Sequence, residues 1–220
     1  MFAAGGLAAE TGAGDLRILM LGDSLTAGYG LASRDALPSR LEAALRARGL
    51  DARVIDAGVS GDTTAGGLAR LEWALAERPH AVILALGAND ALRATDPAVA
   101  RSNLDRLLTM LSKRGLPVLL AGMMAPRNLG PEYTARFDAI YPELAGRHDA
   151  LLYPFLLDGV ATVAALNQAD GLHPNAAGVE VIVKRMLPSV LCVALRTGHP
   201  AAAAAGEPAG CAISSLSRVR

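Results

Sequence analysis

The chain has 220 residues, 52% of them are hydrophobic, and the formal net charge is zero. This length and composition predict one domain with a substantial core and argue against a disordered chain. Because no surplus of basic residues is present to neutralise phosphates, the composition also argues against nucleic-acid binding.

The first half of the chain alternates apolar runs with helical patterns. Strands are expected at residues 16–21, 53–57 and 81–86. The third is a continuous apolar run, which is typical of a strand buried on both faces. A helix that begins near Pro38 and ends before Gly49 separates the first two strands. A second helix, capped by Thr63 or Thr64, precedes the third strand.

The second half continues this alternation. Strands are expected at residues 117–123 and 151–157, and helical patterns at residues 97–114, 133–144, 160–166 and 179–187. Pro142 is expected to kink or split its helix, and Pro188 to bend the last one. Pro154 is compatible with the fifth strand only if that strand lies at a sheet edge.

Five strands that alternate with helices predict an α/β fold, a three-layer α/β/α sandwich around a parallel sheet. We expect the flavodoxin-like strand order 2-1-3-4-5. The domain is predicted to span residues 16–196, between a flexible segment at 1–15 and a disordered tail at 197–220. A bridge between Cys192 and Cys211 is possible, although it would tie a helix end to that tail, and the sequence leaves open whether the two cysteines pair.

The N-terminal segment, residues 1–15, is rich in glycine and alanine and lacks the positive charges that begin an export signal. No apolar run approaches the roughly 20 residues that span a bilayer, so no stable membrane insertion is expected. The protein is expected in the periplasm or outside the cell if an export signal has been removed, and in the cytoplasm otherwise. The sequence predicts no oligomeric state.

Polar residues follow the predicted strands at the edge where the loops of a parallel sheet open together. Ser24 follows the first strand, and His173 is the only one of the four histidines in a loop after a strand. A serine hydroxyl needs an adjacent base to act as a nucleophile, and His173 is the best candidate. Asp170 lies three residues earlier, within reach of the imidazole that it would orient. The pattern therefore predicts acyl transfer.

A tetrahedral intermediate also needs hydrogen-bond donors at its oxyanion. The backbone N–H groups of Ser24 and Gly61 and the side-chain amide of Asn89 are candidates, and each follows a different strand. With neutral His173 as the base, kcat/KM is expected to rise with pH and to show an apparent pKa of ~6 to 7.

Further residues near this edge are candidates for substrate contacts: Asp23, Leu25, Ala88, Asp90, Arg93 and Leu129. Some of them have an ordinary structural interpretation as well. The two aspartates are more typical of turn residues that accept from loop N–H groups, and the arginine of a solvated surface residue. The loops at 89–93 and 125–131 contain few large side chains, so short and medium acyl chains are favoured.

Four blocks, in order and each after its own strand, resemble the motifs of the SGNH (GDSL-type) hydrolase family: Gly22-Asp23-Ser24-Leu25, Gly61, Gly87-Ala88-Asn89-Asp90 and Asp170-Gly171-Leu172-His173-Pro174. Residues 22–30 and 60–64 are similar to its bacterial arylesterase, acyl-CoA thioesterase I and lysophospholipase branch. Ala88 departs from the second glycine that this family often carries in its third block.

The resemblance implies a flavodoxin-like SGNH hydrolase fold without metal or cofactor. It implies that Ser24, Asp170 and His173 form a catalytic triad. It also implies that Ser24, Gly61 and Asn89 form the oxyanion hole. The implied substrates are esters and thioesters of small or lipid alcohols.

The chain is therefore predicted to be a serine esterase that acts through an acyl-enzyme on Ser24. Its partner would be a small-molecule ester, aryl or short- to medium-chain, or a thioester. Two alternatives stay open. The same triad could serve a carbohydrate acetylesterase or an acyltransferase. A non-enzymatic flavodoxin-like module could bind an anion at residues 22–30, although no P-loop lysine is present.

Overall fold

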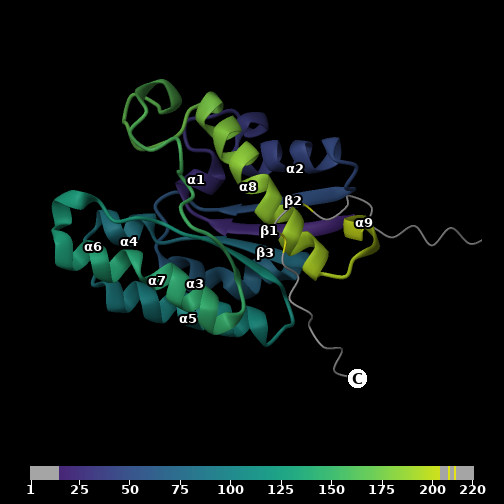
Figure 1. Cartoon of the computed structure of the whole chain (residues 1–220), viewed down its shortest axis with the longest axis horizontal. Helices are drawn as coiled ribbons and strands as arrows, with labels where there is room; N and C mark the ends of the chain where they lie inside the picture. The colour runs from purple at the N-terminus through teal and green to yellow at the C-terminus, as the bar shows by residue number, and fades with distance from the viewer. Residues whose placement is uncertain (1–14, 204–207, 209–210, 212–220) are drawn as a thin grey trace, which may run out of the picture.

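The computed structural model describes residues 15–203, 208 and 211 (Figure 1). Five strands form one parallel sheet in the order β2-β1-β3-β4-β5. Their bounds are β1 (Leu16–Gly22), β2 (Ala52–Gly58), β3 (Ala81–Ala85), β4 (Val118–Ala121) and β5 (Leu151–Tyr153). The predicted parallel sheet and its strand order are confirmed.

Helices cover both faces of this sheet (Figure 1). On one face α2 (Leu37–Ala47) packs with α8 (Ala176–Arg196), and on the other α5 (Pro97–Ser112) packs with α3 (Thr64–Ala74) and α7 (Ile140–His148). The shorter helices are α1 (Ser24–Ala27), α4 (Ala88–Leu92), α6 (Pro131–Asp138) and α9 (Pro200–Ala203). These layers form the predicted α/β/α sandwich. None of the helices in the described ranges is both long and apolar enough to cross a bilayer.

The core is centred on the middle strands of the sheet. All five residues of β3 are buried, as the continuous apolar run predicts for a strand covered on both faces. Helix α5 adds one buried stripe, made of Leu104, Leu107, Leu108 and Leu111. Burial of each such leucine stabilises the fold by roughly 1.5–3 kcal/mol. This packing holds the strand ends, and the loops that follow them, in fixed positions.

Side-chain caps determine where three helices begin. The hydroxyl of Thr63 accepts from the N–H of Gly66, so Thr63 rather than Thr64 caps α3. Asp96 caps α5, whose first residue, Pro97, is where the helical pattern at 97–114 begins. Asn175 caps α8 two residues after His173. Each cap satisfies a backbone N–H that the helix itself leaves without a partner.

Several element boundaries differ from those expected. The strand β5 lies at the sheet edge, but it ends at Tyr153 because Pro154 has no N–H for the ladder. The expected helix around Pro142 is split at Ala139 into α6 and α7, which places Pro142 in the first turn of α7. Residues 160–166 form turns and a 3₁₀ turn instead of the expected helix. Helix α8 continues through Pro188 to residue 196.

The C-terminal segment also differs from expectation. Residues 197–203 are ordered, and α9 packs against α8 with Ala202 only 2% exposed, so the expected disorder from residue 197 is wrong there. Cys192 and Cys211 form a disulfide whose Cα atoms lie 5.6 Å apart, a pairing that the sequence left open. The other residues of the expected tail, and residues 1–14 of the expected flexible segment, lie outside the described residues.

Candidate active site

Ser24, His173 and Asp170 form a continuous hydrogen-bonded series at the carboxyl edge of the sheet. The Ser24 Oγ lies 3.0 Å from His173 Nε2, and His173 Nδ1 lies 2.6 Å from Asp170 Oδ2. The serine follows β1, and the other two follow β5, so the parallel sheet brings together residues 149 positions apart in the sequence. This series has the geometry of a nucleophile, a base and a carboxylate that orients the base.

The carboxylate of Asp170 is held by its own turn. Its Oδ1 accepts from the backbone N–H groups of Leu172, at 2.9 Å, and His173, at 3.0 Å. The hydrogen bond from the His173 N–H, followed by that of the imidazole, lowers the pKa of Asp170 to about 2. Asp170 is therefore ionised at neutral pH and can stabilise an imidazolium.

Gln168 and Tyr29, which the sequence did not suggest, hold the loop of His173 against the loop after β1. The Gln168 Nε2 donates to the Tyr29 carbonyl oxygen at 2.7 Å and, within its own loop, to the Pro174 carbonyl oxygen at 3.0 Å. The ring of Tyr29 lies 4.7 Å from the imidazole ring, measured between centroids. The imidazole is thus oriented from one side by Asp170 and packed from another by Tyr29.

Asp23 is buried under the nucleophile turn. Its Oδ1 accepts from the Leu25 N–H at 3.0 Å and caps α1, which begins at Ser24. Burial raises the pKa of Asp23 to about 6. The role in substrate binding considered for Asp23 therefore gains no support, because the carboxylate faces the turn and does not line the cleft.

The three candidate oxyanion donors come from three loops. Within the described residues, the backbone N–H groups of Ser24 and Gly61 donate no hydrogen bond. The Asn89 Nδ2 donates to the Asp62 carbonyl oxygen at 2.9 Å and, at a longer 3.3 Å, to Asp23 Oδ2. Gly61 has a φ of 83°, a backbone conformation that glycine adopts without the steric cost that other residues have there.

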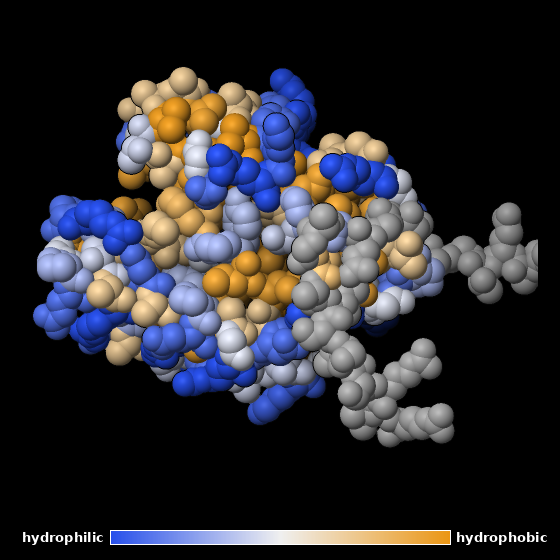
Figure 2. All heavy atoms as spheres, in the orientation of Figure 1, coloured by the Kyte–Doolittle hydropathy of each residue, from blue (hydrophilic) through white to orange (hydrophobic). Residues whose placement is uncertain are grey.

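A cleft of about 430 Å³ opens beside the Ser24 Oγ. It lies between the loops after β3 and β4 and the long loop after β5, where the surface in Figure 2 is indented. The lining is mainly apolar and includes Leu25, Ala88, Leu92, Met123, Met124, Phe155, Leu157, Ala161 and Leu172. Such a lining suits an acyl chain.

The other residues considered for substrate contacts lie elsewhere. Asp90 is 2% exposed, and its carboxylate accepts from the N–H and hydroxyl of Thr64, at 2.8 and 2.7 Å. The Arg93 Nη2 donates to the Gly61 carbonyl oxygen at 2.9 Å. Leu129 ends a 3₁₀ turn and is not among the residues that line the cleft. Asp90 and Arg93 thus connect neighbouring loops, and none of the three residues lines the cleft.

The expected loop at 125–131 contributes Ala125, Pro126 and Arg127 to the lining, but sequence reasoning missed Met123, directly after β4, and the residues contributed after β5, such as Phe155. Their position directly after buried strands was the available signal. No group of three histidine, cysteine, aspartate or glutamate side chains within the described ranges is arranged to hold a metal ion.

Comparison with known proteins places this geometry in a family. The profile of the GDSL-like lipase/acylhydrolase family matches residues 20–181. Esterase TesA of Pseudomonas aeruginosa is 39% identical over 174 residues, which are 79% of this chain and 87% of that protein. An arylesterase of Vibrio mimicus is 41% identical over 160 residues, 72% of this chain and 80% of that protein.

A solved structure agrees with the sequence comparisons. The crystal structure of AlinE4, an SGNH-hydrolase family esterase, is 49% identical and superposes with a TM-score of 0.69, covering 80% of this chain and 95% of that one. The family match over residues 20–181 spans all four motif blocks that suggested the resemblance. The chain belongs to the GDSL-like lipase/acylhydrolase family.

Proposed function

We propose that this member of an ester-hydrolysing family cleaves carboxylic esters through an acyl-enzyme on Ser24. The observation that carries the proposal is the hydrogen-bonded series from the Ser24 Oγ through His173 to Asp170. The activities after which the relatives are named, esterase and arylesterase, support the same reaction for this chain.

The reaction follows from the positions of these groups. The Ser24 Oγ bonds to the ester carbonyl carbon while its proton passes to His173 Nε2. The tetrahedral intermediate then releases the alcohol, which takes the proton from His173 and leaves an acyl-enzyme. Water attacks this ester by the same route, and the carboxylic acid leaves with Ser24 restored.

The oxyanion of each intermediate is placed near three donors. The N–H groups of Ser24 and Gly61 are available for it. Asn89 supplies a third donor by exchanging its longer, 3.3 Å hydrogen bond to Asp23 for one to the oxyanion. The shorter bond of Asn89 to Asp62 stays in place and orients the amide.

Covalent labelling tests this assignment directly. A fluorophosphonate is expected to modify one serine, and the labelled peptide should contain Ser24. His173→Ala should slow the labelling at least a hundredfold because the base is lost. A label on another residue, or unchanged labelling of the His173 variant, would refute the proposal.

We also propose that the apolar cleft takes short and medium acyl chains, as esters or thioesters. Ala161 lines this cleft, so Ala161→Leu should shorten it. We expect kcat/KM for p-nitrophenyl octanoate to fall about tenfold more than for the acetate, since a few methylene groups of pocket contact are lost. If Ala161→Leu lowered kcat/KM equally for the octanoate and the acetate, as oxygen esters or as thioesters, the acyl chain would have to bind outside this cleft.

A further inference from the structure

One guanidinium connects the nucleophile strand to the loop of a candidate oxyanion donor. Arg70 lies on α3, and its Nε donates to Asp62 Oδ2 at 2.7 Å. Its Nη2 donates to the carbonyl oxygen of Gly22 at 2.8 Å. Gly22 is the last residue of β1, two positions before Ser24, and Asp62 directly follows Gly61.

Asp62 extends this connection to the side-chain amide of Asn89, the third candidate oxyanion donor. Its side chain accepts from Arg70, and its carbonyl oxygen accepts from the Asn89 amide at 2.9 Å. Helix α3 passes so close that a side chain at Gly66 would overlap the Asp62 carboxylate. The three loops that carry the candidate donors are therefore cross-linked through Asp62 and Arg70.

The pair is shielded from solvent, unlike other ion pairs of this protein. The side chains of Arg70 and Asp62 are 17% and 15% exposed. The Arg114 Nη2 donates to both carboxylate oxygens of Glu72, but those side chains are 40% and 60% exposed. Exposed pairs contribute little, whereas removing one partner of a shielded, charge-assisted pair is costly.

We propose that Arg70 is a positioning residue of the esterase. It holds the Gly61 N–H and the Asn89 amide at fixed positions relative to Ser24, without touching the substrate. This inference rests on the proposed roles of those three residues. A displacement of about 1 Å costs up to a hundredfold in rate, and loss of one oxyanion donor costs roughly 10²–10³-fold.

The test uses Arg70→Met, which removes the charge and both donors, with Arg114→Met as the matched control. On p-nitrophenyl butyrate, with active sites counted by fluorophosphonate titration, we expect kcat of Arg70→Met to fall roughly 10- to 100-fold while KM changes less than threefold. Arg70→Lys, which keeps the charge and one donor, should recover part of this loss. Arg114→Met should leave kcat within twofold.

Binding of a trifluoromethyl ketone, which forms a tetrahedral adduct with the serine, separates positioning from folding. Its Ki should rise in parallel with the loss in kcat for Arg70→Met and for Asp62→Asn. Because the two residues act as one brace, the double variant should lose no more than threefold beyond the worse single variant.

The inference is overturned if Arg70→Met lowers only Tm, or if kcat and Ki change no more than in the Arg114 variant. Independent, multiplying losses in the double variant would also overturn it. Should Arg70→Met fail to fold, Arg70→Lys and Asp62→Asn carry the same test. Failure of the proposed function looks different, because Ser24 would then escape labelling and the Ser24→Ala variant would stay active.

Discussion

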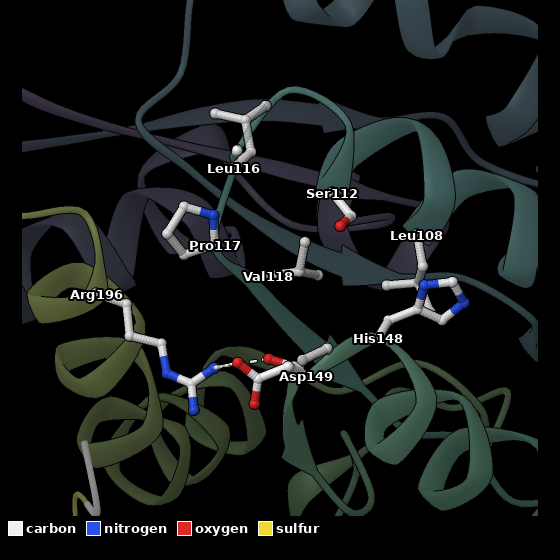
Figure 3. Close-up of a pocket in the computed structure, with 10 residues that line it drawn as sticks. Leu108, Ser112, Leu116, Pro117, Val118, His148, Asp149 and Arg196 are labelled. Atoms are coloured by element: carbon white, nitrogen blue, oxygen red, sulfur yellow. Dashed lines mark hydrogen bonds and ion pairs between the residues drawn. The ribbon is translucent and has the colours of Figure 1, made fainter. Parts of the chain in front are cut away.

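Each edge of the parallel sheet has a hollow with serine, histidine and aspartate side chains in it or directly beside it. At the carboxyl edge these are Ser24, His173 and Asp170. At the amino edge Ser112, His148 and Asp149 line a pocket of about 310 Å³, together with Arg196 (Figure 3). The two hollows have the same types of residue, but the hydrogen bonds that these residues form differ.

At the amino edge the polar groups are engaged with other partners. The Nε2 of His148 lies 2.8 Å from Asp105 Oδ1, and the Arg196 Nη1 donates to the Asp149 carbonyl oxygen at 2.7 Å. No hydrogen bond joins Ser112 to His148 in the part of the chain that the structure describes. A hollow with suitable residue types is thus not sufficient for catalysis. The hydrogen-bonded series and the donors without acceptors distinguish the carboxyl edge.

The largest contrast is expected between the two serines. Ser24→Ala should lower kcat/KM on p-nitrophenyl butyrate at least 10³- to 10⁴-fold because the nucleophile is lost. Ser112→Ala should change it less than twofold. Substantial activity in the Ser24 variant would end the assignment of the carboxyl edge.

The two aspartates should differ almost as much. Asp170→Asn should reduce kcat roughly 10³- to 10⁴-fold, because the amide no longer stabilises the imidazolium. Asp149→Asn should have little effect on kcat, since its exposed side chain lies 3.6 Å from Arg196 at the edge of the sheet opposite Ser24, and the Arg196 Nη1 also donates to its backbone carbonyl. In the wild type, the pKa of about 2 keeps Asp170 ionised throughout a pH 5–9 profile of kcat/KM. A loss under tenfold in Asp170→Asn would argue against its proposed role.

For Asp23 the expected effect is on the pH dependence of the unfolding free energy. Its pKa, raised to about 6, means that the folded protein holds the proton more tightly than the unfolded chain between pH 3.8 and 6. The stabilisation of the folded state by this proton is fully present below pH 3.8 and is lost as pH rises through 6. Relative to Asp23→Asn, the wild type should therefore lose up to about 3 kcal/mol of unfolding free energy over this interval. Urea titrations at pH 4.5 and 8 would measure it, and a constant difference would contradict it.

The smallest effect on activity is expected from the disulfide near the amino edge. Cys211→Ser opens a loop that joins residues 19 apart, which should lower the unfolding free energy by at most about 3 kcal/mol. The value of kcat/KM should stay within twofold, because Cys192 lies near the far end of α8 from His173. Two reactive thiols in the unreduced, unfolded protein would disprove the bridge.

Much of the fold was predictable because local patterns determine it. The apolar run of β3 and the cap of α5 at Asp96 need no long-range information. The turns at residues 160–166 were not predictable, because a short apolar segment is compatible with several backbone conformations. Pairing of the two cysteines depends on where α9 returns against α8, which no local pattern encodes.

The candidate site divides in the same way. The triad residues stand in motif blocks after strands, so their convergence was predictable from the parallel topology. No local pattern points to Arg70, Gln168 or Tyr29 as residues of the site. Arg70 contacts Gly22 from 48 positions away and Gln168 contacts Tyr29 from 139 positions away, and only the folded chain brings them together.

The 149-residue separation between Ser24 and His173 has a consequence for refolding. The base lies between the edge strand β5 and helix α8, the last large elements of the chain, so a partly folded molecule without them has a nucleophile but no base. Ester hydrolysis should therefore return only when this C-terminal portion docks, later than helix content recovers. The rate at which activity returns would then measure the final assembly step of the domain.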